Sequence, residues 1–163
     1  MGDWAGREAP TGMAQLEVTH MKIHGNCHCG KISFTALVDP MDVTVCHCTD
    51  CQILSGAPFR ASVRANREGV QIEGRATEYI KTANSGNQRI QGFCGTCGTN
   101  LYTMALNDRS VIGLRLGCIA ERATLSPQRQ VWGRSAIPWV KKLIDGNCHI
   151  EGPSSALQQP SHS

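Results

Sequence analysis

The sequence predicts an all-β domain with little helix, and three observations support this fold class. Apolar and polar residues alternate over short stretches such as 31–38 and 77–81, a period that is typical of strands with one buried face. Turn-forming pairs such as Asp39-Pro40 and Asn107-Asp108 separate these stretches. No helical period persists for more than about two turns. The predicted strands are residues 31–38, 43–45, 59–63, 70–73, 77–81, 88–93, 99–103 and 111–117, and residues 52–58 are expected to form a turn-like loop.

The length of the chain, 163 residues, fits one domain with a modest core. Residues 1–20 contain Gly, Ala and Pro without sustained periodicity, so we expect a flexible N-terminal arm there. Residues 21–150 contain all the predicted strands and are expected to form the folded domain. Ser, Gln and Pro dominate residues 151–163, and such a composition predicts a disordered tail.

Charge and hydropathy exclude several classes of protein. The formal net charge is +3, and acids and bases are interspersed without a basic stripe, so we expect no nucleic-acid partner. No apolar run reaches the ~18 residues that a membrane-spanning helix needs. The N-terminus has no apolar signal core. We therefore expect a soluble cytoplasmic protein, in which the nine cysteines stay reduced and those in clusters are metal ligands.

Two cysteine pairs, each followed by a glycine, predict one closed zinc site. The pairs are Cys27-His28-Cys29-Gly30 and Cys94-Gly95-Thr96-Cys97-Gly98. Structural zinc takes four ligands in a tetrahedron, and glycine supplies the positive φ that a tight turn around a metal needs. The pairs lie far apart in sequence, so one zinc ion bound by all four thiols would join the two ends of the β-core. The alternative is a pair of redox-active thiol pairs or buried free thiols.

A third cluster, Cys46, Cys48 and Cys51, offers only three thiols. Either His47 or Asp50 could complete a second closed site. His47, however, lies between two ligands in an extended segment, where neighbouring side chains point to opposite sides. We therefore expect an open zinc site with three protein ligands and one free position, which is the arrangement of catalytic zinc.

The ligand set of this cluster indicates the chemistry. Zinc with three thiolates carries a net charge of about −1 and prefers a soft fourth ligand. A substrate thiol suits this position, because a metal lowers the pKa of a thiol and the thiolate is the nucleophile. The expected reaction is therefore addition of a thiol to a small aldehyde, or the reverse cleavage of a carbon–sulfur bond.

Other notable side chains are expected to have structural roles. Cys118 and Cys148 stand alone and are interpreted as small buried residues. His28 and His149 are expected to lie on the surface or to take part in packing. Trp132 and Trp139 are predicted to belong to the core.

Three segments of the chain resemble one known family. They are residues 24–34, which include the first cysteine pair with Ile32 and Phe34, residues 46–56, which include the triplet and Gly56, and residues 93–99 around the second pair. These segments are similar to the glutathione-dependent formaldehyde-activating family, which includes eukaryotic proteins of the centromere protein V type. The likeness extends to Val131-Trp132, Pro138-Trp139 and Ile144-Asp145-Gly146, and covers roughly residues 22–150.

This resemblance implies a fold, two zinc ions and a reaction. It implies a zinc-stapled β-fold of the tent or sandwich type, in which a structural zinc is bound by Cys27, Cys29, Cys94 and Cys97. It implies a catalytic zinc at Cys46, Cys48 and Cys51, with glutathione as the thiol. The family activity is condensation of glutathione with formaldehyde to S-hydroxymethylglutathione, a carbon–sulfur lyase reaction.

The chain departs from the family pattern at two places. Gln91-Gly92 precedes Phe93 where an arginine is common, and Gln130 stands where a histidine is often found. Two other functions remain open alongside the enzyme. A non-catalytic zinc-stabilised binding module of the centromere protein V type would have a second zinc that is permanently four-coordinate. A redox or zinc sensor would show reversible oxidation of the triplet.

Overall fold

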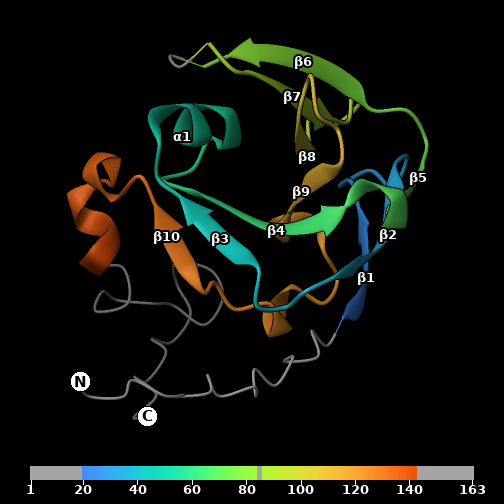
Figure 1. The fold of residues 1–163 in the computed structure, drawn as a ribbon, viewed down its shortest axis with the longest axis horizontal. Helices are drawn as coiled ribbons and strands as arrows, with labels where there is room; N and C mark the ends of the chain where they lie inside the picture. The colour runs from blue at the N-terminus through green and yellow to red at the C-terminus, as the bar shows by residue number, and fades with distance from the viewer. Residues whose placement is uncertain (1–19, 84–85, 143–163) are drawn as a thin grey trace, which may run out of the picture.

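The computed structural model describes residues 20–83 and 86–142 and contains two β-sheets (Figure 1). The three-stranded sheet has the order β1 (Met21–Asn26), β2 (Ser33–Val38), β5 (Gln71–Glu73). The seven-stranded sheet has the order β10 (Arg129–Val131), β3 (Val43–Cys46), β4 (Arg60–Asn66), β9 (Val111–Arg115), β8 (Asn100–Ala105), β7 (Gln88–Phe93), β6 (Thr77–Thr82). All strand pairs are antiparallel except β10 with β3. The predicted mainly-β fold is confirmed.

Helical structure is confined to short elements in the described part of the chain. The one α-helix is α1 (Thr49–Ser55). The 3₁₀ helices are η1 (Arg67–Gly69), η2 (Leu116–Cys118), η3 (Arg122–Thr124), η4 (Gly133–Ser135) and η5 (Pro138–Lys142). No helix among the described residues combines the length and the apolar character that crossing a membrane requires.

The two faces of the seven-stranded sheet have different compositions. Alternate side chains such as Val63, Ile90 and Ile112 are fully buried and join the core, which also contains Ile23 and Phe34 of the three-stranded sheet. The core therefore lies between the two sheets. The intervening residues of β4 and β7, such as Ser62, Arg64 and Arg89, are polar or charged and face away from the core, because successive side chains of a strand point to opposite faces.

Two glycines allow aromatic rings to lie across the backbone just before the cysteine pairs. Gly25 pairs with Phe34 across β1–β2, and Gly92 pairs with Tyr102 across β7–β8. A Cβ atom added at either glycine would lie 2.2 Å from the facing ring. Each glycine stands two residues before the first cysteine of its pair, so the two hairpins approach their cysteine turns in the same way.

The prediction of a loop at residues 52–58 is wrong, because α1 occupies residues 49–55. Its N-cap is Cys48, whose side chain accepts a hydrogen bond from the Cys51 backbone N–H, and its C-cap is Gly56 with φ of 61°. Cysteine is not among the residues that usually cap helices, and seven residues make about two turns, too few for a visible period. Neither the N-cap nor the hydrophobic period therefore predicts this helix from the sequence.

The prediction that Trp132 and Trp139 belong to the core is also wrong. Their exposed fractions are 52% and 50%. Both tryptophans follow β10, which is an edge strand of the large sheet and has no further strand beyond it to bury them. The arm at residues 1–20, of which only His20 is described, and the tail at 151–163 lie outside the described residues, as do Cys148 and His149.

Replacing Gly92 with alanine should destabilise the fold. The new Cβ would overlap the Tyr102 ring, and overpacking of this kind typically costs about 1–3 kcal/mol. We expect a lower urea midpoint for G92A than for the wild type. The control is G69A, because a Cβ at Gly69 meets no atom within 4 Å. Equal midpoints for G92A and G69A would contradict this account of the hairpin.

Candidate metal centres and active-site cavity

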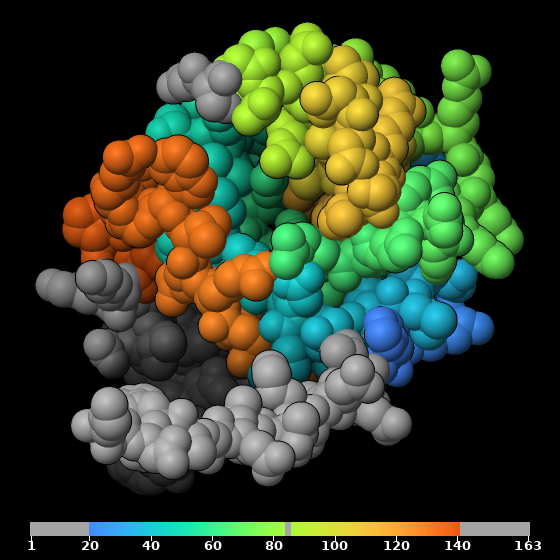
Figure 2. Space-filling view, in the orientation of Figure 1, coloured from blue at the N-terminus to red at the C-terminus, as the bar shows by residue number. Residues whose placement is uncertain are grey.

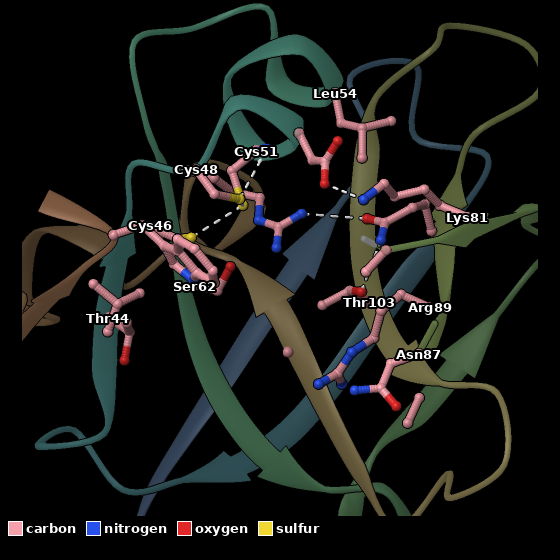
Figure 3. Close-up of a pocket in the computed structure, with 18 of the residues that line it drawn as sticks. Thr44, Cys46, Cys48, Cys51, Leu54, Ser62, Lys81, Asn87, Arg89 and Thr103 are labelled. Atoms are coloured by element: carbon pink, nitrogen blue, oxygen red, sulfur yellow. Dashed lines mark hydrogen bonds and ion pairs between the residues drawn. The ribbon is translucent and has the colours of Figure 1, made fainter. Parts of the chain in front are cut away.

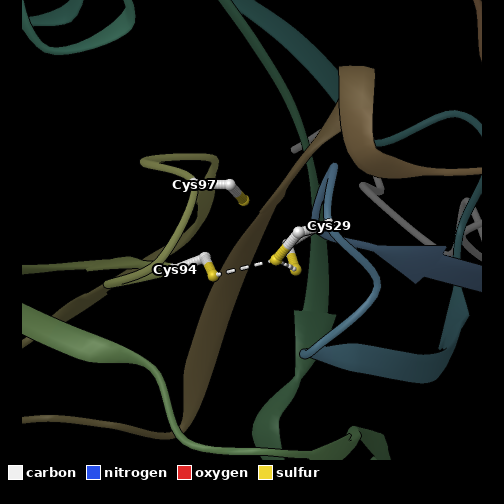
Figure 4. A group of neighbouring side chains, drawn as sticks. Cys29, Cys94 and Cys97 are labelled. Carbon is white, nitrogen blue, oxygen red and sulfur yellow. Dashed lines mark hydrogen bonds between the residues drawn. The ribbon is translucent and has the colours of Figure 1, made fainter.

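The first candidate metal centre joins the two sheets. Cys27 and Cys29 lie in the turn between β1 and β2, and Cys94 and Cys97 lie in the turn between β7 and β8. Figure 4 shows Cys29, Cys94 and Cys97 reaching toward one another from these turns. All four sulfur atoms lie within 4.8 Å of one another, so the structure brings together the residues predicted for the closed site.

The separations of the sulfur atoms fit a tetrahedral zinc ion. Cys27 Sγ lies 3.6 Å from Cys29 Sγ, and Cys29 Sγ lies 3.8 Å from Cys94 Sγ. Ligands at ~2.3 Å from a tetrahedral zinc lie about 3.8 Å from one another, whereas bonded sulfurs lie about 2.05 Å apart. The eight described cysteines are free thiols. This cluster therefore has the donor atoms and the spacing for one zinc ion.

Matching turns hold the two cysteine pairs. Gly30 has φ of 76° and Gly98 has φ of 74°, and the N–H of each donates to the carbonyl of the first cysteine of its pair, at 3.0 and 2.8 Å. Only glycine adopts this backbone region without strain. The hydrogen bond between Cys97 Sγ and Thr99 Oγ1, 3.2 Å long, lowers the pKa of Cys97 to about 5. A lowered pKa favours the thiolate, which is the form that binds a metal.

The second candidate centre is the cysteine triplet at the junction of β3 and α1. Cys46 ends β3, Cys48 caps α1, and Cys51 lies in the first turn of the helix. Cys51 Sγ lies 3.0 Å from Cys48 Sγ and 3.2 Å from Cys46 Sγ. These distances are shorter than the ~3.8 Å edge of a zinc–thiolate tetrahedron. Small shifts of the three thiols would therefore suit them to an ion.

Neither His47 nor Asp50 belongs to the triplet. The buried His47 ring hydrogen-bonds through Nε2 to Gln130 Oε1 at 2.8 Å and packs edge-on against Phe59. The Asp50 carboxylate pairs with Lys81. Within the described residues, the group contains three thiols and no fourth ligand. Both side chains that could have closed the site have other partners.

The triplet favours one negative charge on Cys46. The hydrogen bond from the Cys51 thiol lowers the pKa of Cys46 to about 5, and the same bond, together with burial, raises the pKa of Cys51. The positive charge of Arg60 lowers both values. Arg60 pairs directly with Cys46 across β3 and β4, so a cation faces the cysteine on the same side of the sheet.

A cavity of about 1000 Å³ opens beside the triplet. Its floor is the polar face of the large sheet, and α1 and the segment after β10 form its walls. Figure 2 shows the surface hollowed between this orange segment and the yellow-green strands. In Figure 3, the three cysteines lie on one side of the cavity and Lys81, Asn87 and Arg89 on the other. Its volume is at the upper end of the range for small-molecule sites.

Cationic side chains dominate the charged lining of this cavity. The six cations are Arg60, Arg64, Lys81, Arg89, Arg129 and Arg134, and the two acids are Asp50 and Asp108. Arg64 and Arg129 pair with Asp42, and Lys81 pairs with Asp50. Among the described residues, the other three arginines have no carboxylate partner within ion-pair distance. The cavity therefore suits an anionic ligand.

A hydrogen-bond network forms part of the cavity floor. The Gln91 Oε1 atom accepts hydrogen bonds from Arg115 at 2.8 Å and from Arg60 at 3.3 Å. The Gln91 Nε2 atom donates to Thr103 Oγ1 at 3.1 Å, and Arg115 also donates to Ser62 Oγ at 3.0 Å. Burial, followed by the nearby Arg60 charge, lowers the pKa of Arg115 to about 9. The network contains two guanidinium groups and no acid.

The segment after β10 places an aromatic ring at the cavity. Trp132 has φ of 60°, the one positive φ of a non-glycine residue in the described ranges, and it lines the cavity. The Arg134 guanidinium lies 5.0 Å from the centre of the Trp132 ring, a cation–π arrangement. A bulky residue in this backbone region is an outlier, and such outliers cluster at functional sites.

Other sequence predictions have mixed outcomes. Cys118 is half-buried against the core, its thiol donates to the Asn100 carbonyl, and it is a member of neither cluster. His28 is exposed, as predicted. Sequence reasoning missed the arginine-lined cavity, whose residues come from many elements. Its one local signal is the alternation of polar residues at 60, 62 and 64 and at 89 and 91, which marks a polar strand face.

Comparisons with known proteins agree with this architecture. The profile of the family described as "Glutathione-dependent formaldehyde-activating enzyme" matches residues 22–135. An uncharacterized lyase of Schizosaccharomyces pombe is 31% identical over 86 residues, which cover 53% of this chain and 60% of the yeast protein. A crystal structure of a Rhodobacter sphaeroides protein superposes with a TM-score of 0.53 at 17% identity, covering 66% of this chain and 99% of that protein. This likeness shows a shared fold.

Substitution of Cys94 by serine should unfold the protein or deplete its metal. Cys94 is 2% exposed and belongs to the cluster that joins the two sheets. Because metal binding at such a site contributes directly to folding, we expect insoluble C94S protein or a sharp fall in the thermal midpoint. Metal content by mass spectrometry and circular dichroism test this. The matched control is C118S, outside both clusters. Folded C94S with unchanged zinc would contradict the prediction.

Proposed function

Since the chain belongs to the glutathione-dependent formaldehyde-activating enzyme family, we propose that it is a lyase-type enzyme acting on glutathione and formaldehyde. The reaction is addition of the glutathione thiol to formaldehyde, giving S-hydroxymethylglutathione, or cleavage of that adduct. The observation that carries this proposal is the position of the cysteine triplet, which lies beside a cationic cavity large enough for a tripeptide.

The two cysteine clusters would have different roles in this enzyme. Cys27, Cys29, Cys94 and Cys97 would hold a structural zinc, because their four sulfur atoms lie within 4.8 Å of one another and four is the number of ligands that a tetrahedral zinc takes. Cys46, Cys48 and Cys51 would hold a catalytic zinc with one position left for substrate. When bound there, zinc would supply a Lewis acid that keeps a substrate thiol in its thiolate form.

The cavity accounts for recognition of glutathione. This tripeptide has two carboxylates separated from its thiol by several bonds. A thiol placed at the triplet would direct the carboxylates across the cavity, toward Arg89 and Asn87 on the opposite side (Figure 3). Arg134, which lies over the Trp132 ring, is a second cation without a carboxylate partner in the described chain. Guanidinium groups bind carboxylates through paired hydrogen bonds.

The shape of α1 keeps the triplet beside the cavity. Gln52 donates through Nε2 to the His47 carbonyl and to the Ser135 carbonyl, at 2.8 and 2.9 Å. Asn100 donates to the Leu54 carbonyl at 2.9 Å and links the other side of α1 to β8. These bonds fix the helix that carries Cys51 to the segment after β10 and to β8, so the thiols are held in place before substrate binds.

A non-catalytic zinc module is the competing function. Such a module needs the four-cysteine cluster for stability. It does not require arginines without carboxylate partners beside the cysteine triplet. The arginines of the cavity favour a ligand-binding site, and a catalytic assay separates the two functions.

Substitution of Cys48 by alanine should abolish catalysis and spare the fold. The four-cysteine cluster still joins the sheets in this variant, so we expect one zinc instead of two and a thermal midpoint within a few degrees of the wild type. The reaction is followed by NMR exchange between glutathione, formaldehyde and their adduct. The control is C118A. Exchange at the uncatalysed rate for both wild type and C48A would favour the binding module.

Substitution of Arg89 by glutamine should weaken glutathione binding. Loss of one charge-assisted hydrogen bond should raise the KM for glutathione about tenfold, equivalent to about 1.4 kcal/mol. The KM for a small neutral thiol should change much less, because such a thiol has no carboxylate to bind. The charge-matched control is R75Q, at an exposed position between β5 and β6. Equal KM increases for both thiols would show that Arg89 does not recognise carboxylates.

A further inference from the structure

The residue directly opposite Cys46 in the large sheet is Arg60. The register of β3 and β4 pairs their Cα atoms, so the two side chains leave the sheet on the same face. Paired residues of this kind have Cβ atoms about 4.5–5.5 Å apart. Both side chains line the cavity. Arg60 is therefore the cation of the cavity that the strand register places beside the thiols.

Three side chains hold Arg60 in position. Arg60 Nη1 donates to Gln91 Oε1 at 3.3 Å. The Gln91 amide cannot turn freely, since Oε1 also accepts from Arg115 and Nε2 donates to Thr103. The Thr103 hydroxyl in turn donates to the Ile90 carbonyl at 2.9 Å. One donor of Arg60 is thus used for orientation, and a guanidinium group has four others to offer a ligand.

Apart from the Cys46 thiolate opposite Arg60, the charges of this network lack a counter-ion. Arg60 and Arg115 share one neutral amide oxygen, and no carboxylate of the described residues lies within ion-pair distance of either. Arg115 is 6% exposed and lies beneath the floor, whereas Arg60 is half-buried and open to the cavity. Buried cations are unfavourable without an anion. A negative charge that appears beside Arg60 would therefore be strongly stabilised.

We propose that Arg60 is a catalytic residue whose guanidinium group binds the aldehyde oxygen and stabilises the negative charge that forms on it. This inference rests on the proposed function. As the thiolate sulfur bonds to the carbonyl carbon, the π electron pair of the carbonyl moves to oxygen. Solvent water protonates the resulting alkoxide, and the proton lost earlier by the thiol neutralises the hydroxide left behind. Arg60 keeps its proton throughout.

Gln91, Arg115 and Thr103 act as positioning residues in this proposal. Gln91 orients Arg60, and Arg115 and Thr103 fix Gln91. A donor that is already aimed at the developing charge stabilises the transition state without reorganising. In the reverse direction, the same guanidinium group would bind the adduct oxygen as the carbon–sulfur bond breaks.

The test compares R60A with the wild type in the NMR exchange assay, on zinc-loaded protein. Removal of one donor to an oxyanion typically lowers kcat by about 10²–10³. We expect a loss of this size for R60A, with the KM for glutathione within about threefold of wild type. Guanidinium chloride added at millimolar concentration should raise the rate of R60A at least tenfold. Urea, its neutral analogue, should leave the rate of R60A unchanged. R75Q is the control for loss of a surface charge.

Three results would overturn the inference. They are a kcat of R60A within threefold of wild type, a loss confined to KM, and a loss that guanidinium and urea restore equally or not at all. Zinc content and thermal midpoint are measured on each variant, so misfolding is recognised. If R60A misfolds, R60K and R60Q replace it, and R60K should retain more activity than R60Q. Failure of the proposed function looks different, because wild type and C48A would then share one exchange rate.

Discussion

The rest of the structure depends on the contact between two cysteine turns, one between β1 and β2 and the other between β7 and β8. Cys29 and Cys94, which meet there, are 65 residues apart in the sequence. One turn belongs to the small sheet and the other to the large sheet, so the cluster fixes how the two sheets face each other. Closing so long a loop is entropically costly, and a metal bound by four thiolates can offset that cost. The core then fills the space between the sheets.

Once the sheets are held, the period of two divides the large sheet into a structural and a functional face. On β4, Val63 is buried in the core, while Arg60 and Ser62 lie on the cavity side. On β9, Ile112 and Leu114 are buried in the core, while Gly113 lines the cavity. A Cβ atom at Gly113 would lie 3.2 Å from Thr103, so glycine avoids a close contact at this part of the cavity floor. The same strands therefore supply stability and a binding surface.

Two glutamines take part in hydrogen bonds around the triplet and the cavity floor. Gln91 accepts hydrogen bonds from Arg60 and Arg115, and Gln130 accepts one from the buried His47. At position 91, a third cation beside two arginines would be unfavourable, whereas a neutral amide can bridge them. The arrangement of charge around the triplet is thus a property of the whole network, to which β4, β7 and β9 each contribute.

The sequence by itself determined most of the strands, though not β1 or β10, the grouping of seven cysteines into four and three, and the family, because these depend on local period and spacing. Cysteines at 27, 29, 94 and 97 must meet if one metal is to bind all four. Only the tertiary structure decided the rest. Cys48 caps a helix that is too short to show a hydrophobic period. Trp132 lies exposed beyond an edge strand. The cavity brings together Arg60, Arg89 and Arg134 from three separate elements. Strand register and strand order set these neighbours, and neither can be read from the spacing of residues along one chain.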